Sequence, residues 1–520
     1  MFPMVQKPQR LPMPILAALS IFFVFVFFAS QKMGGQTIDE AFYLVTWGQI
    51  RSAVLAWLAG GEPFDFRENS VTLYGMLPAI PAYEAASVLN IFFRFPESAQ
   101  YELKIFLLHL FSFIWSTGTC FVVFHIVRIL TQNKILSYFS FGLVALYPTW
   151  LGHSFFNFKD APLAFFFSLA LFGALYCQEA APKQFRLGVL IVTLGTVGAG
   201  AVKLAGMPLL IVQWSGVLYA AISSKHRGSY LATIILSGMA IIAGVYVVTP
   251  AAWFEPVDYL IAAVEAMAHF PWPGCMITFG ECIGPTRENW SSFHYLVSWL
   301  SVRLPLFVIV LLVPMALLLS FKRKAKYWIL LLTPVVPLLA IIGMNSTLYD
   351  GVRHVLFVLP PLFVICIVGL NELWKISTGL RVLIGASLSM VLALFIVDDI
   401  ILFPYNYVYF NEMSRGYAVS SEFDLDYWGF SLEEAHQAVP ANQTYYYGVV
   451  RDMQAAHAKP GQFFVHNPEE LAPGTQYYSV VTTRGNRGVG RGCEPVHEIT
   501  RQLPFAREPM VLARVNLCNG

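Results

Sequence analysis

The chain has 520 residues, of which 57% are hydrophobic and 12% are charged, and its mean hydropathy is +0.61. Soluble domains carry about 25% charged residues, so this composition excludes a soluble enzyme and indicates an integral membrane protein. The formal net charge at pH 7 is only +2. The sequence has no basic patch of the kind that binds nucleic acid, so we expect no nucleic-acid partner.

Apolar segments long enough to cross a bilayer recur along most of the chain. A transmembrane helix needs about 20 such residues, and on that measure the sequence predicts an all-α bundle of about eleven transmembrane helices. Lys7 and Arg10 precede the first segment and no clear cleavage site follows it, which predicts a retained signal anchor. The fifth and sixth segments are separated only by Lys203, so they could form one broken or re-entrant element. The segments lie near residues 12–30, 105–130, 135–151, 161–178, 187–202, 204–222, 230–250, 304–320, 327–343, 355–372 and 382–403.

Basic residues are concentrated in alternate short loops between these segments. Because such residues favour the cytoplasmic side, the bias places the N-terminus in the cytoplasm. The opposite short loops hold only Lys159, Lys203 and Arg353, and cations at that membrane edge are candidates for binding an anion. The loops expected in the cytoplasm contain Arg128, Lys134, Lys183, Arg186, Lys225, Arg227, Lys322, Arg323, Lys324, Lys326, Lys375 and Arg381.

This orientation places four pieces of the chain outside the cytoplasm. We expect a transmembrane domain, residues 1–403, followed by a small extracytoplasmic α+β domain of about a hundred residues. The first external loop is expected to contain two interfacial helices, near 42–58 and 83–93. The four external pieces are residues 31–104, 152–160, 251–303 and 404–520.

The C-terminal piece differs from the rest of the chain because it is polar and rich in Gly and Pro turns. Short β-like runs at 444–450 and 476–482 predict strands. Ser431 and Glu434 have the spacing of a capping box, which predicts a short helix after Phe430.

Four cysteines lie in the regions expected outside the cytoplasm. Cys275 and Cys282 share one loop, and Cys493 and Cys518 share the C-terminal domain. Both pairs could form disulfides in an oxidising compartment. A metal site is the alternative, but no histidine cluster accompanies these cysteines.

Polar residues that could carry chemistry gather at the external membrane edge, on several different loops. A carboxylate there can take a proton from an attacking hydroxyl, and Lys and Arg can hold a phosphate. Each residue also has a structural alternative: Lys159 and Asp160 could form a local ion pair, Lys203 could snorkel, and Asp350 could cap a helix. The candidates are Asp39, Glu40, Tyr43, Tyr74, His153, Asn157, Lys159, Asp160, Lys203, Asp350, Arg353 and His354.

Several motifs among these residues resemble one enzyme family. Thr37 to Glu40 looks like its acidic first-loop motif, and the Tyr-Asp-Gly-Val-Arg-His run from Tyr349 to His354 is the most specific match. Residues 152–162 look like the second-loop motif, with Phe158 where proline is expected. The chain thus resembles the GT-C membrane glycosyltransferases, close to the protein O-mannosyltransferases and aminoarabinose transferases of family 39 and its bacterial relatives. Further matches are residues 202–206, 407–412 and 424–429.

The resemblance implies a GT-C fold in a multi-pass plasma (inner) membrane protein. It also implies a polyprenyl-phosphate-linked sugar as donor, and inverting transfer to a glycan, lipid or protein acceptor on the external face. By the same resemblance Asp39 would be the general base, Lys203 and Arg353 would hold the lipid phosphate, and a divalent metal could lie at Asp39 and Glu40. Glu40 and Asp160 would orient the acceptor or the sugar. The remaining substrate-binding candidates are Tyr74, His153, Lys159, Asp350 and His354.

Two other classes of protein share these features. A transporter or flippase of lipid-linked saccharides would have the same spans and charges, but it predicts inverted repeats and charges near the bilayer midplane. The sequence has no convincing repeat, and its charges lie at one edge. A structural or assembly subunit would use its C-terminal domain to bind a partner, and its loop charges would be inert.

Overall fold

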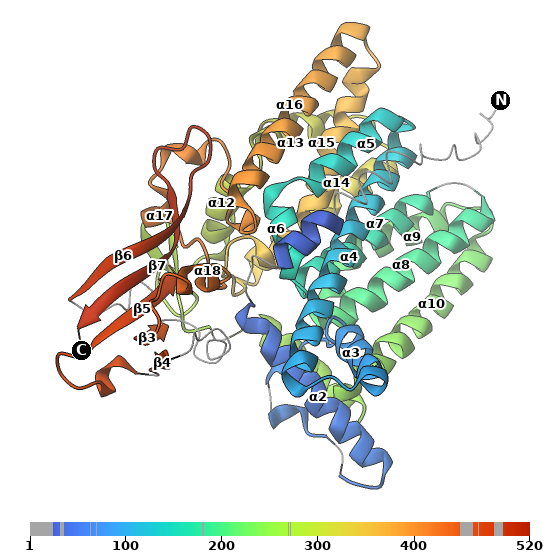
Figure 1. Cartoon of the computed structure of the whole chain (residues 1–520). Coiled ribbons are helices and arrows are strands. Elements are labelled where there is room, and N and C mark those ends of the chain that lie inside the picture. Colours follow the sequence, from blue (N-terminus) through green and yellow to red (C-terminus); the bar gives the residue numbers. More distant parts are fainter. Residues whose placement is uncertain are drawn as a thin grey trace.

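The computed structural model describes residues 24–31, 36–62, 64–68, 70–178, 181–268, 270, 272–447, 461–465, 467–482 and 492–519. Figure 1 shows a bundle of long helices with a β-sheet beside it, formed by the C-terminal part of the chain. The first expected span, near 12–30, lies largely outside the described residues, although residues 24–31 are helical.

The bundle consists of long apolar helices, two of which are sharply bent. Within the described residues, seven helices are long and apolar enough to cross a membrane, or nine if each of two bent pairs counts as one span. The pair α5 (Lys134–Ala145) and α6 (Pro148–Phe156) bends by 61°, and the pair α12 (Ser292–Arg303) and α13 (Leu306–Ser320) bends by 114°. A proline lies at each break and prevents the helix from continuing. The seven single spans are α4 (Glu97–Thr131), α8 (Pro182–Val202), η3 to α9 (Leu204–Ile222), α10 (Arg227–Val247), α14 (Ala325–Gly343), η6 with α15 (Arg353–Trp374) and α16 (Thr378–Leu402).

The structure confirms the helical bundle, and within the described residues nine of the eleven expected spans are present if each bent pair counts as one span. The segment expected near 161–178 is α7 (Asp160–Tyr176), which has 17 residues and is shorter than the other spans. Lys203 has an extended backbone between α8 and the short helix η3 (Leu204–Gly206), so the fifth and sixth segments are two elements.

α15 lies in the core of the bundle, whereas α10 and α16 lie at its surface. Of the most apolar 18 residues of each span, 94% are buried in α15, but only 11% in α10 and 17% in α16. A helix that is apolar on all sides must be buried in protein or in lipid. The exposed apolar surfaces of α10 and α16 are therefore suited to lipid.

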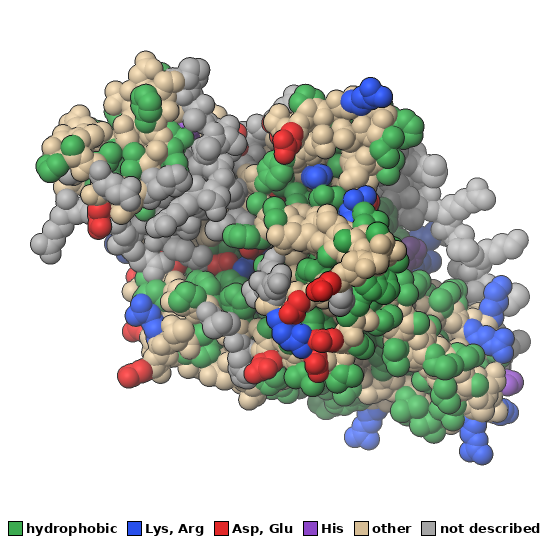
Figure 2. Space-filling view, turned by 90° about the horizontal axis from the view of Figure 1, so that it is seen from below, with side chains coloured by type: hydrophobic (Ala, Val, Ile, Leu, Met, Phe, Trp, Pro, Cys, Tyr) green, Lys and Arg blue, Asp and Glu red, His purple; other side chains and the backbone are tan. Residues whose placement is uncertain are grey.

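Short helices cover one end of the bundle. Both helices expected in the first external loop are present, as α2 (Ile38–Leu58) and α3 (Ile80–Phe93), at the lower end of Figure 1. Between them lie η1 (Phe66–Glu68) and η2 (Ser70–Leu73), and η2 contacts α11 (Pro256–Ala268). Figure 2, which looks at the molecule from this end, shows charged side chains of both signs beside broad hydrophobic areas.

The C-terminal residues form a five-stranded mixed sheet in the order β4-β3-β5-β7-β6. β3 pairs in parallel with β4 and β5, whereas β7 is antiparallel to both β5 and β6. A separate hairpin, β1 (Met276–Thr278) and β2 (Glu281–Ile283), is closed by the disulfide Cys275–Cys282, and Cys493–Cys518 joins β6 to β7. The strands are β3 (Thr444–Tyr447), β4 (Phe463–Phe464), β5 (Gln476–Thr482), β6 (Cys493–Arg501) and β7 (Met510–Asn519), with helices α17 (Val419–Glu422) and α18 (Leu432–His436) beside them.

The short helix expected after Phe430 is present as α18, but the capping box predicted for it is wrong. The Ser431 hydroxyl donates to Asp426 Oδ2 at 2.5 Å instead of capping the helix. The Glu434 carboxylate accepts a hydrogen bond from Tyr405 at 2.7 Å. Both side chains therefore hold the C-terminal region together rather than starting the helix.

The C-terminal region begins by packing against the bend between α12 and α13. Arg303, buried at this bend, donates through Nη1 to the carbonyl oxygens of Tyr407 at 2.9 Å and Tyr409 at 2.5 Å. Asn411 donates through Nδ2 to the carbonyl oxygens of Ser301 at 2.6 Å and Leu304 at 2.7 Å. The sheet is thus attached to the bundle through buried contacts.

Candidate active site

A cavity of about 610 Å³ lies among α2, α7, α9, α11, α14 and the segment that leads into η6. Part of its wall is polar, and most of the residues predicted from the sequence to bind substrate or take part in catalysis lie in this part. All of the predicted catalytic and substrate-binding residues line the cavity except Glu40, His153 and Asp350. The polar lining consists of Asp39, Tyr43, Tyr74, Lys159, Asp160, Lys203, Ser346, Thr347, Tyr349, Arg353 and His354.

The adjacent carboxylates Asp39 and Glu40, in the first turn of α2, point in different directions. Glu40 accepts hydrogen bonds from the backbone N–H and the hydroxyl of Thr37, at 3.2 and 2.8 Å, in a capping box that begins the helix. Its Oε1 also lies 2.9 Å from Nε2 of the buried His109 on α4. Successive side chains on a helix point about 100° apart. Asp39 therefore faces the cavity while Glu40 fixes the first turn of α2.

Asp39 is held by two cations from distant parts of the chain. Its Oδ2 accepts from Lys159 Nζ at 2.6 Å and from Arg353 Nη1 at 3.0 Å. The second terminal nitrogen of Arg353, Nη2, lies 2.9 Å from Oδ2 of Asp350. The guanidinium thus bridges a carboxylate inside the cavity and one behind it.

A second ion pair lies beside the first. Lys203 donates to Asp160 Oδ1 at 2.5 Å, and Asn157 donates to the other oxygen of this carboxylate at 3.2 Å. The extended backbone of Lys203 follows directly after α8, next to the loop that contains Gly75. A Cβ on Gly75 would lie 1.9 Å from the carbonyl oxygen of Ala201. Only glycine therefore permits this close crossing of the first loop over the end of α8.

The charges around Asp39 determine its protonation state. Burial alone raises the pKa of Asp39, but the nearby charges of Lys159 and Arg353 outweigh burial and hold it well below its usual range. Burial lowers the pKa of Lys159 by more than Asp39 raises it. Burial also raises the pKa of Tyr74 to about 12, so its hydroxyl remains protonated at neutral pH. Asp39 is therefore an ionised carboxylate that can accept hydrogen bonds. Tyr74, whose hydroxyl is protonated, can donate one.

Three predicted residues lie outside the cavity. Glu40 is occupied at the start of α2, and Asp350 pairs with Arg353. His153 is buried on α6, where its ring packs against Trp428 with centroids 5.5 Å apart. Because the carboxylates of Asp39 and Glu40 have separate partners, they do not fit a shared metal ion. No group of three or more metal-binding side chains occurs within the described residues.

The apolar part of the cavity wall was not predicted from the sequence. It comes from α9, α11 and α14, and three of its residues are also exposed on the surface: Ile211 by 59%, Val264 by 45% and Met344 by 51%. Apolar residues are common in such helices, so only the tertiary structure identifies these as cavity-lining residues. The cavity therefore joins a charged site to an apolar surface of the bundle.

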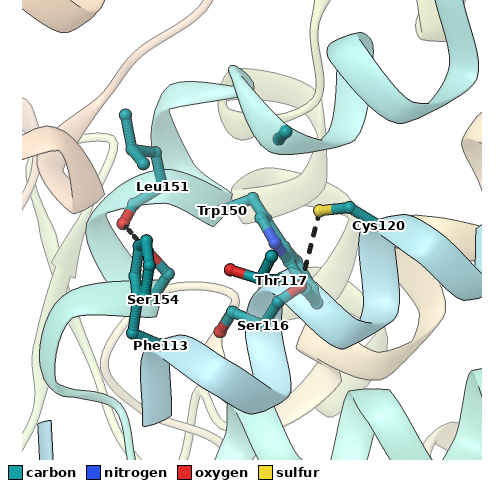
Figure 3. A pocket seen from close by; sticks show the side chains of 8 residues that line it. Phe113, Ser116, Thr117, Cys120, Trp150, Leu151 and Ser154 are labelled. Atoms are coloured by element: carbon teal, nitrogen blue, oxygen red, sulfur yellow. Dashed lines mark hydrogen bonds between the residues drawn. The ribbon is translucent and has the colours of Figure 1, made fainter. Parts of the chain in front are cut away.

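A second, much smaller cavity lies between α4 and α6 (Figure 3). Its volume of about 10 Å³ is close to that of one water molecule. The Cys120 thiol donates to the carbonyl oxygen of Ser116 at 3.4 Å, as expected for a cysteine packed inside a span. This cavity is too small for a sugar or a lipid.

Two solved structures are similar to the chain over nearly its whole length. One is ArnT from Cupriavidus metallidurans bound to undecaprenyl phosphate, with 14% sequence identity, a TM-score of 0.51, and 98% of each chain covered. The other is ArnT from the same organism in the apo state, with 11% identity, a TM-score of 0.50, and 96% of this chain and 98% of that chain covered. No family model and no curated protein matches the chain. These likenesses show that the chain has an ArnT-like fold, as the motifs led us to expect.

Proposed function

From this ArnT-like GT-C fold, we propose that the chain is an integral-membrane glycosyltransferase. It moves a sugar from a polyprenyl-phosphate donor to an acceptor hydroxyl of a glycan, lipid or protein on the extracytoplasmic face. One observation carries the proposal: the same cavity contains an ionised carboxylate, three cations and an opening to apolar surface. A lipid phosphate needs the cations for its head and the apolar surface for its tail.

The donor phosphate binds to the cations of the cavity. Arg353, Lys159 and Lys203 line it together with Asp39 and Asp160, and Asp350 behind the wall pairs with Arg353, so three cations lie among three carboxylates. A phosphate can bind there in competition with these carboxylates, because charge-assisted hydrogen bonds to Arg and Lys are strong in a site of low dielectric constant. The bound undecaprenyl phosphate of the ArnT structure supports a lipid phosphate as the ligand.

Asp39 acts as the general base in the transfer step. It takes the proton of the acceptor hydroxyl while the hydroxyl oxygen forms a bond to the anomeric carbon of the sugar. The bond from that carbon to the phosphate oxygen breaks, and its electron pair leaves with the phosphate, which the cations stabilise. Attack from the side opposite the phosphate inverts the anomeric carbon.

The ion pairs of Asp39 make its basicity depend on the donor. Lys159 and Arg353 lower the pKa of Asp39 while they bind it directly. A lipid phosphate competes for the same cations, which weakens their hold on Asp39 and raises its pKa. The base thus becomes stronger when the donor is in place.

The cavity end of the bundle is assigned to the extracytoplasmic side. The short loops rich in Lys and Arg belong to the opposite end, and such residues favour the cytoplasm. The sheet formed by residues 444–519 then lies outside the cytoplasm with its disulfide Cys493–Cys518, as expected in an oxidising compartment.

The test is sugar transfer by purified Asp39→Asn protein in liposomes. Loss of a general base should lower the rate by about 10²–10⁴-fold. Asp258→Asn, which changes an exposed carboxylate on α11 that pairs with Arg67, serves as the control and should keep its rate. Transfer at the wild-type rate by Asp39→Asn would remove Asp39 as the base. Movement of a lipid-linked saccharide across the liposome membrane without a new glycosidic bond would favour a flippase instead.

The sugar and the acceptor can be identified in cells. Without the protein, its lipid-linked sugar donor should accumulate and the glycan that it makes should be lost. Mass spectrometry of both fractions, compared with cells that produce the Asp39→Asn variant, reports the two partners of the reaction.

A further inference from the structure

The C-terminal region approaches the charged site with the side chain of Trp428. The guanidinium carbon of Arg353 lies 5.2 Å from the centre of the Trp428 ring, and 4.8 Å from the centre of the Tyr349 ring. A guanidinium within about 6 Å of an aromatic ring centre is attracted by the ring. Arg353 is therefore held by two aromatic rings as well as by two carboxylates.

Trp428 is placed by a tightly bonded turn. Asp426, which is fully buried, accepts hydrogen bonds from the backbone N–H groups of Phe430 at 3.1 Å and Ser431 at 2.8 Å. It also accepts one from the hydroxyl of Tyr407. Gly429 has a φ of +74°, a backbone conformation that favours glycine. This turn fixes the direction in which the indole points.

Two side chains of the helical bundle also pack against the indole of Trp428. The Trp428 ring packs edge-on against Phe156 of α6, with centroids 5.1 Å apart, and against His153, with centroids 5.5 Å apart. Trp428 is only 4% exposed and is absent from the lining of the cavity. An effect of Trp428 on a ligand there is therefore indirect, and Arg353 is a cavity-lining residue that its ring contacts.

We propose that Trp428 is a positioning residue, through which the C-terminal region holds the Arg353 guanidinium in place to bind the lipid phosphate. The inference rests on the proposed function, since it assumes that Arg353 binds this phosphate. It gives a role to the 424–429 motif and to His153, which buttresses the indole instead of contacting the substrate.

The test measures binding of undecaprenyl phosphate to the full-length protein in nanodiscs. Trp428→Leu should weaken binding by about tenfold, whereas Trp428→Phe, which retains a ring, should stay within about threefold of wild type. Tyr445→Leu is the control, because Tyr445 is a fully buried aromatic residue of β3 that packs on His436 and Phe464. It should leave binding unchanged. Binding by Trp428→Leu at the wild-type level would overturn the inference.

A double-mutant cycle separates positioning from a general loss of structure. If Trp428 acts through Arg353, then Trp428→Leu should have little further effect in an Arg353→Gln background, which has no cation for the ring to hold. Additive effects would overturn the inference. If Arg353→Gln itself leaves binding unchanged, then Arg353 does not bind the phosphate, and that part of the proposed function is wrong whatever Trp428 does.

Fluorinated tryptophans at position 428 give the same test without a change in volume, should Trp428→Leu not fold. Each added fluorine weakens the attraction between the ring and a cation, so binding should decrease stepwise from tryptophan to the mono- and difluoro forms. Constant affinity along this series would show that the indole only fills space.

Discussion

At the scale of single residues, the cavity depends on which carboxylate pairs with which cation. Lys159 and Asp160 are neighbours in sequence and could have paired with each other, but Lys159 binds Asp39 and Asp160 binds Lys203. Each pair joins two different elements across the cavity. The candidate phosphate-binding cations are therefore the same groups that hold the carboxylates, and a phosphate must compete with those carboxylates for them.

The pH dependence of transfer tests this competition. Because Lys159 and Arg353 hold the pKa of Asp39 below its usual value of about 3.9, Asp39 stays ionised in the free enzyme as the pH falls to that value. We expect kcat/KM, which reports the free enzyme, to show no loss of activity from Asp39 between about pH 5 and 7. Lys159→Gln removes one cation and should move this acid limb upward in pH. An unchanged acid limb in the variant would contradict the ion pair.

At the scale of elements, the bent span α5–α6 brings the second loop to the site. α6 packs directly against η7 (Asn406–Val408), at the start of the C-terminal region. A Cβ on Gly152 would lie 2.0 Å from the backbone nitrogen of Tyr407. The glycine of the second-loop motif is thus explained by the close approach of two backbones.

Gly152→Ala should be strongly destabilising for this reason. Backbone atoms cannot move aside as a flexible side chain can, so we expect a loss of at least about 2 kcal/mol in the free energy of unfolding. Gly142→Ala in α5 is the matched control. Its Cβ would meet only the side chain of Leu392 at 3.4 Å, and alanine favours a helix over glycine. Thermal unfolding in detergent measures both variants, and equal midpoints would contradict the packing.

At the scale of the whole molecule, the C-terminal region and the bundle form one structure. Arg415, buried in the C-terminal region, lies 2.5 Å from Asp398 near the end of α16. Breaking a buried pair by removing one partner costs about 3–5 kcal/mol, because the other charge is left buried. We therefore expect the bundle to be less stable without the C-terminal region.

Two truncations test this dependence. The fragment 1–403 loses the contacts of Arg303, Asp398 and α6 with the C-terminal region, so we expect it to aggregate. The fragment 1–439 keeps residues 404–431 and the buried Arg415, and should remain monodisperse. Gel filtration in detergent compares the two fragments. A monodisperse 1–403 that still bound undecaprenyl phosphate would contradict the role given to the C-terminal region.

The sequence alone determined the class of the protein, the approximate position of its helices, and the polar residues that gather at one membrane edge. Hydropathy and segment length are local properties, and they were sufficient for these predictions. They did not predict the bends near Pro148 and Pro305, because the angle between two helices depends on how they pack.

The tertiary structure decided which of those polar residues face the cavity. Asp39 and Glu40 are adjacent in sequence, yet they point in different directions from the first turn of α2. The contact between Trp428 and Arg353 joins residues 75 positions apart. A side chain's direction and its long-range partners depend on how distant elements pack, and no local pattern in the sequence contains that information.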